Sequence, residues 1–327
     1  MHNLLMCIGN FISKPNKEYI KQYLLIIKII KNELNQFTRI KHINSYLFFI
    51  FNLFILNSNE IDKEMIKEEI YKNLINIYPF QDKNNNKMNI EDNNENKSYC
   101  TSIKLLILKI LGKILSLDDG EESITQKLID YGIIQFFKKI IDESENDFKI
   151  IKNVAFCLSN ICAGNLREIN TLYNEGVFKK LIKIGENIYN LLKNNINLKE
   201  REISELHRAF SEICYVFGIT INNSLFEKLL PLVEYNNHII IIFIIEALSL
   251  FKDNIPLVEL CLNSLSRLIC YEKEIEIFNS NIRVSDLNIS FSEFLDRNGI
   301  RSILEYFIKN NNDEIGGIAF GIYDNIY

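Results

Sequence analysis

A pair of side chains suited to binding a peptide lies in the stretch Phe156–Asn165, which reads FCLSNICAGN. Phe156 and Asn160 are four residues apart in an apolar helical pattern that begins at Ile150, so both project from one helix face. A carboxamide can hydrogen-bond the main chain of a passing peptide, and an aromatic ring can pack on a long side chain, lysine in particular. A single pair of this kind is more often a core ring beside a helix-end amide. It therefore indicates a peptide-binding site only if the same pair recurs along the chain.

The same arrangement recurs on what we expect to be the closing helix of each repeat. The first and fifth positions hold Met6/Asn10, Phe48/Asn52, Lys109/Lys113, Phe156/Asn160 and Phe210/Cys214, and the fifth positions are 42, 61, 47 and 54 residues apart. The step of 61 contains Gln81–Ser98, an Asn-rich polar segment that is predicted to be a disordered insertion because it cannot bury apolar surface. Stacked closing helices would form a ladder of peptide-binding residues: Phe156, Asn160, Met6, Asn10, Phe48, Asn52 and Phe210.

A second repeated feature is a helix stop followed at once by another apolar helix. It occurs at Gly132, Gly176, Asn236 and Gly299, residue types that tolerate the left-handed conformation that ends a helix. The first step is 44 residues, and the 167 residues from Gly132 to Gly299 correspond to four steps of about 42 with one marker missing, within the roughly 40–47 residues of armadillo and HEAT units. Each such unit leaves one helical face unburied, so we expect the units to stack into a superhelix.

Composition favours long helices and argues against several partners. Hydrophobic residues make up 47% of the 327-residue chain, whereas Gly (12) and Pro (4) are too scarce for a many-stranded protein. The net charge of −5 argues against nucleic acid as the main partner. The apolar runs Tyr46–Leu56 and Ile239–Ile245 are too short to span a bilayer, so they are predicted to be buried helices and no membrane partner is expected.

The residues that could carry catalysis or bind metal form no pattern. The four histidines are far apart and have no Cys, Asp or Glu at metal-ligand spacing, and the seven cysteines include no CxxC. Ser159 has no partners for nucleophilic catalysis, and no glycine-rich phosphate loop occurs. We therefore expect no enzyme activity, no catalytic residue, no metal and no cofactor.

The segment Leu158–Asn165, LSNICAGN, resembles the most characteristic segment of the importin alpha (karyopherin alpha) family. Leu108–Ile114 with Asp118–Gly120 is similar to the preceding repeat of that family, Val258–Leu265 to its penultimate repeat and Phe294–Tyr327 to its final repeat. The resemblance implies an all-α armadillo-repeat superhelical solenoid over residues 1–327, with about seven repeats. It also implies a concave groove in which Asn160 holds the peptide main chain and Phe156 packs on a side chain.

The resemblance further implies a function in nuclear protein import. Its expected partners are a cargo protein with a basic nuclear localisation signal and, at the C-terminal repeat, the nuclear export receptor, and its expected location is cytoplasm and nucleus. Binding of importin beta is not expected, because the alignment places Met1 within roughly the fourth of about ten repeats and so lacks the basic N-terminal arm. The chain would then be a fragment or shortened product, the back half of an ordinary adaptor, or a divergent paralogue.

Several residues depart from the family pattern. The family has Trp at the first groove position, but this chain has no Trp, and Phe and Met bind cations less well. Lys113 replaces an Asn and would repel a basic peptide, while Asn153 and His207, followed by Arg208, stand where the family has acidic residues. The alternatives are therefore a non-transport armadillo scaffold or a C-terminal fragment that keeps only export-receptor binding.

Overall fold

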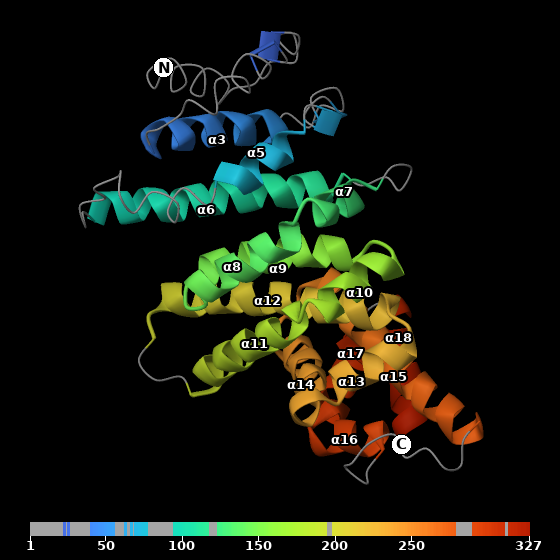
Figure 1. Cartoon of the computed structure of the whole chain (residues 1–327). Coiled ribbons are helices and arrows are strands. Elements are labelled where there is room, and N and C mark those ends of the chain that lie inside the picture. Colours follow the sequence, from blue (N-terminus) through green and yellow to red (C-terminus); the bar gives the residue numbers. More distant parts are fainter. Residues whose placement is uncertain are drawn as a thin grey trace. The chain divides into compact units, whose positions relative to one another are not determined.

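The computed structural model describes residues 22–23, 25–26, 40–55, 62–63, 66–67, 69–77, 94–117, 123–194, 198–278, 290–310 and 313–327. All regular secondary structure in these residues is helical (Figure 1). The chain divides into two compact units, Met1–Asn160 and Ile161–Tyr327, and the boundary lies near the end of one helix. Met6 and Asn10 lie outside the described residues.

The helices follow one another in triplets of a short first, a longer second and a third helix. Unit 1 contains α3 (Ile40–Ile55), α5 (Ile70–Ile77), α6 (Asn94–Leu115), α7 (Ile124–Asp130), α8 (Ile133–Ser144) and most of α9 (Phe148–Cys162). Unit 2 contains α10 (Leu166–Asn174), α11 (Val177–Asn194), α12 (Glu200–Asn223), α13 (Phe226–Val233), α14 (Tyr235–Leu250), α15 (Ile255–Phe278), α16 (Phe291–Arg297), α17 (Ile300–Asn310) and α18 (Asp313–Ile326). The third helices are α9, α12, α15 and α18, and α3 and α6 hold the corresponding places before them.

Three of the predicted helix stops, Gly132, Gly176 and Gly299, separate the first and second helices of their triplets, and Asn236 lies in the first turn of the second helix α14. Gly132, Gly176 and Gly299 have φ values of 99°, 70° and 77°, and Asn236 has a φ of 52°, so the left-handed conformation is confirmed. The four stops belong to four consecutive triplets, so the expectation of a missing marker was wrong. Gly132 to Gly299 spans three long repeats, because α12 and α15 each extend over 24 residues.

Unit 1 has its core where α6 packs on α3 and α5. Apolar side chains of α3 and α6, such as Phe49, Leu53, Ile107 and Leu111, are fully buried. α6 already begins at Asn94, so the last five residues of the predicted insertion Gln81–Ser98 are helical, and the rest of it lies outside the described residues.

Unit 2 is built around stacked second and third helices. α12 packs on α15, α15 on α18, and α14 contacts α11, α12, α15 and α17. The run Ile239–Ile245 is buried on nearly every face of α14, as predicted for an inner helix. No single helix among the described residues is long and apolar enough to cross a membrane, although α13 and α14 meet that test together as a pair bent by 79°.

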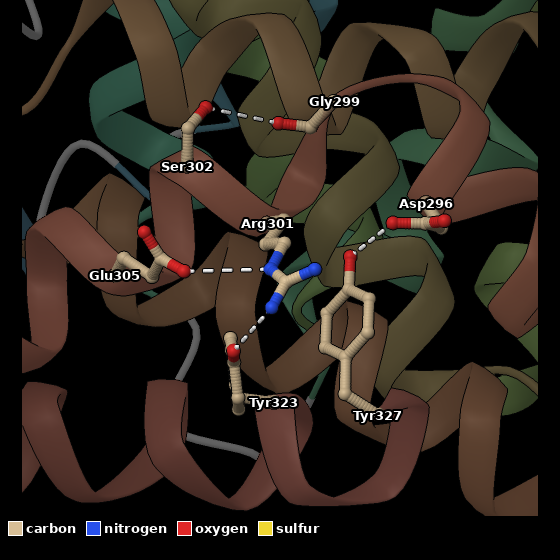
Figure 2. Close-up of polar contacts among 7 residues, drawn as sticks. All are labelled: Asp296, Gly299, Arg301, Ser302, Glu305, Tyr323 and Tyr327. Carbon is tan, nitrogen blue, oxygen red and sulfur yellow. Dashed lines mark hydrogen bonds and ion pairs between the residues drawn. The ribbon is translucent and has the colours of Figure 1, made fainter.

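The end of unit 2 is held by polar contacts around Arg301 of α17 (Figure 2). Its guanidinium donates to Glu305 (3.4 Å) and to the hydroxyl of Tyr323 on α18 (3.2 Å), and it lies 4.8 Å from the ring centre of Tyr327. The Tyr327 hydroxyl in turn donates to Asp296 of α16. These bonds connect all three helices of the last triplet and fix the rotation of α18.

Candidate peptide-binding surface

Phe156 and Asn160 lie together on α9, as predicted, and both reach solvent. Phe156 is 38% exposed and Asn160 is half-buried. The Phe156 ring lies across Gly112 of α6, where an added Cβ would be only 2.8 Å from two ring carbons. The Asn160 amide donates to the Phe156 carbonyl (3.0 Å) and is 3.5 Å from the Gly112 carbonyl. The amide oxygen has no hydrogen-bond partner within the described parts of the chain and can accept from a bound main chain.

Other residues of the Leu158–Asn165 segment stabilise the helix junction. Asn165 is the N-cap of α10 and forms a reciprocal capping box with Glu168, whose carboxylate is buried. A Cβ at Gly164 would lie 1.8 Å from that carboxylate, so glycine is needed there. Cys162 accepts a hydrogen bond from Thr220 (3.3 Å), and burial raises its pKa to about 12. The C-terminal part of this segment therefore has a local structural function, and Asn160, together with Phe156 just before the segment, is the candidate for ligand contact.

The predicted pair on α3 is only partly available. Phe48 is half-buried, but Asn52 is only 7% exposed, and its amide nitrogen finds no partner within the described ranges. Asn52 was therefore wrongly placed on the surface, because the solvent-reaching face of α3 runs through Asn44, Phe48 and Phe51. The Phe51 ring is covered by Lys109 of α6, with Nζ 5.3 Å from the ring centre.

Phe210, predicted to bind peptide, was also wrongly placed on the surface. Its exposure is 0%, and its ring lies among those of Phe243 (5.5 Å), Phe251 and Tyr189 (both 6.5 Å). Cys214, four residues on, is buried as well. The sequence pattern for α12 was therefore two residues out of register, since an aromatic residue next to an apolar stripe belongs as readily to the core as to the surface.

Exposure identifies the corresponding surface pairs on the other third helices. Each pair is four residues apart and reaches solvent: Lys109/Lys113 on α6, Arg208/Glu212 on α12, Glu259/Asn263 on α15 and Phe320/Asp324 on α18. We call the solvent-reaching sides that carry these pairs and Phe156/Asn160 the third-helix faces. Asn263 was missed by sequence reasoning, although it lies in the segment Val258–Leu265 that resembles the penultimate repeat. Its side chain is exposed and has no hydrogen-bond partner in the described structure.

Two further residues bear on ligand choice. Lys113, predicted to face the groove, is half-buried. Burial raises the pKa of the Asp62 carboxyl, and the charge of Lys113 offsets part of that rise. His207 packs its ring edge on Phe251 (5.8 Å). No group of His, Cys, Asp or Glu in the described residues could hold a metal ion.

The chain is similar in fold to designed armadillo-repeat proteins. It aligns with one such protein in complex with the peptide (KR)4 at 15% identity and a TM-score of 0.52, over 99% of each chain. A second designed armadillo-repeat protein gives 13% identity and a TM-score of 0.58 over 91% of this chain and 98% of that one. A third armadillo-repeat protein, from a set computationally designed for modular peptide recognition, gives 14% identity and a TM-score of 0.52 over 99% of this chain and 100% of that one. No protein-family model and no curated protein matches the sequence. The predicted fold class, an all-helical armadillo-repeat solenoid, is confirmed.

Proposed function

We propose that this armadillo-repeat chain is a non-enzymatic adaptor that binds extended segments of partner proteins on the third-helix faces of each unit. The observation that carries the proposal is the recurrence of exposed side chains four residues apart on successive third helices. The Asn160 amide oxygen and the Asn263 amide are available for a ligand. Amides hydrogen-bond a main chain whatever its sequence, so neighbouring charges would decide which side chains are accepted.

For the adaptor function we propose nuclear protein import, in cytoplasm and nucleus. The resemblance of Leu158–Asn165 to importin alpha supports this, as do the charges on the third helices of unit 2. Among the side chains that the structure describes on these helices, the solvent-reaching charged ones are seven acidic residues and three arginines: Glu200, Glu202, Glu205, Glu212, Glu259, Glu314, Asp324, Arg201, Arg208 and Arg267. An excess of carboxylates attracts the lysines of a basic localisation signal. Glu259 and Asn263 would form the centre of this site.

The proposed partners are a cargo protein with a basic signal and, at the last triplet, the export receptor. A non-transport scaffold is the second candidate, and the buried Phe210 favours it because the aromatic ladder expected for basic cargo is interrupted there. Binding of the export receptor together with its GTPase would support import even where cargo binding is weak.

Fluorescence anisotropy with a labelled basic localisation peptide tests the import proposal. We expect saturable binding that weakens in Glu259→Ala/Asn263→Ala, because a carboxylate and an amide are lost together. Asn190→Ala is the matched control, since Asn190 is exposed on the second helix α11. Absence of saturable binding, or equal loss in the control, would refute cargo binding at this face.

A further inference from the structure

The described side chains on the third helices of unit 1 carry charge of one sign. Among the residues of α3, α6 and α9 whose side chains the structure describes, none is acidic and five are lysines: Lys104, Lys109, Lys113, Lys149 and Lys152. This positive surface belongs to a chain with a net charge of −5. The uniform sign cannot follow from overall composition, and it is opposite to the net charge of the described residues on the third helices of unit 2.

The lysines differ in how far their charge is balanced. Lys104 forms an ion pair with Glu143 of α8 at 2.9 Å, and the charge of Lys113 acts on Asp62. Lys109 and Lys152 have no ion pair within the described residues, and both reach solvent. These two positive charges are therefore available to a ligand.

Both of these lysines lie beside Phe156. Lys152 precedes Phe156 by four residues on α9, so the two share one helix face. Lys109 precedes Gly112 on α6 by three residues, and the Phe156 ring lies directly across Gly112. One continuous face of unit 1 thus combines an exposed ring, an amide at Asn160 and two unbalanced ammonium groups.

This face also disfavours lysine in a ligand. The Nζ of Lys109 occupies the Phe51 ring, which is the kind of partner that a peptide lysine would seek. A basic peptide would have to displace Lys109 and then lie among like charges, with no carboxylate among the described side chains of these helices to offset them.

We infer that the third-helix face of unit 1 binds an extended segment rich in Asp and Glu from a partner protein, with an apolar side chain packed on Phe156. The inference rests on the proposed peptide-binding function and adds a second ligand class, separate from the basic segment proposed for unit 2. Lys109 and Lys152 pair with carboxylates, and Asn160 accepts from the peptide main chain. A protein segment fits better than a nucleic-acid backbone, because the face offers an amide and one ring rather than the dense cations that phosphates require.

The test uses the full chain and a fluorescein-labelled peptide of about 12 residues, which spans about 40 Å when extended. It contains Glu and Asp around one Leu, and its Gln/Asn counterpart is the neutral reference. We expect the acidic peptide to bind saturably and the neutral peptide not to bind. The affinity for the acidic peptide should fall as the NaCl concentration is raised from about 50 to about 300 mM. Lys109→Glu/Lys152→Glu is expected to reduce its affinity about tenfold or more.

Lys183→Glu/Lys228→Glu is the matched control, because both lysines are exposed on first or second helices and the change in net charge is the same. The inference is overturned if the acidic peptide does not bind, if both double variants weaken it equally, or if a single-stranded oligonucleotide of equal charge competes as well as the unlabelled peptide. Basic-peptide binding measured in parallel separates the two proposals. If the basic peptide binds and the acidic peptide does not, only this inference fails, and if neither binds, the proposed function fails with it.

Discussion

Gly112 and Phe156 provide a direct test of the site geometry through the variant Gly112→Ala. The new Cβ would lie 2.8 Å from two carbons of the Phe156 ring and 3.3 Å from Sγ of Cys157. Carbon atoms in contact are usually about 3.5–4.0 Å apart, so the ring must move by about 1 Å. Because Phe156 is partly exposed, the ring can swing toward solvent, whereas the buried Cys157 has little room.

Two opposing effects set the stability of this variant. Replacing glycine by alanine inside a helix stabilises by up to about 1 kcal/mol, and overpacking costs about 1–3 kcal/mol. We expect a net change between roughly zero and 2 kcal/mol of destabilisation. In a Phe156→Ala background the overlap with the ring disappears, so the same change should stabilise by about 0.5–1 kcal/mol. The coupling free energy between the two positions equals the overpacking cost, about 1–3 kcal/mol.

Urea unfolding followed by far-UV circular dichroism on the single and double variants measures this coupling. Gly317→Ala on α18 is the control, because nothing lies within 4 Å of its added Cβ and only helix propensity changes. Additive effects within about 0.5 kcal/mol would show that the ring does not lie over Gly112 and would remove the basis for the site.

Three further variants test the surrounding structure. Phe210→Ala should lower the free energy of unfolding by about 3–5 kcal/mol, because Phe210 is a core ring. Phe156→Ala should lower it clearly less. Equal losses in thermal melts would contradict the assignment of Phe210 to the core and Phe156 to the surface. Gly164→Ala should cost about 1–2 kcal/mol by displacing the Glu168 carboxylate from the capping box, and a melt unchanged from the parent would refute that reading. Burial between aromatic rings lowers the pKa of His238, so the unfolded state takes up the proton first. Stability should be complete above about pH 6.5 and fall as the pH drops toward the folded-state pKa, and His238→Gln should flatten this dependence in melts between about pH 7 and 5.

The helix stops could be predicted from the sequence because the left-handed backbone conformation that ends a helix favours glycine. Gly132, Gly176 and Gly299 occupy the left-handed region, where other residues are strained, so their type reports their conformation directly. Phe156 and Asn160 could be placed for a similar reason, since a helix end and an apolar pattern fix their face. The repeat lengths could not be predicted, because a helix such as α12 can gain whole turns without changing its pattern.

The errors at Phe210 and Asn52 have one physical cause. An aromatic or amide residue at the edge of an apolar stripe can face either the core or the solvent. Successive residues on a helix are about 100° apart, so the rotation of the helix about its axis decides which of the two it faces. Only the packing of neighbouring helices fixes that rotation. Asn263 shows the converse, since nothing in its local sequence separates an exposed amide from one that caps a neighbour, and the three-dimensional structure does.

The opposite charges of the third helices in the two units also affect how the protein behaves in solution. A net charge of −5 alone would make molecules repel one another, but a positive face on one copy can attract a negative face on the next. At low ionic strength we therefore expect weak, reversible self-association and a negative second virial coefficient in light scattering. Solubility should rise with salt, because at about 0.15 M the screening length falls to about 8 Å. The protein is therefore best handled near physiological ionic strength, where salt screens the attraction between the positive surface of one molecule and the negative surface of another.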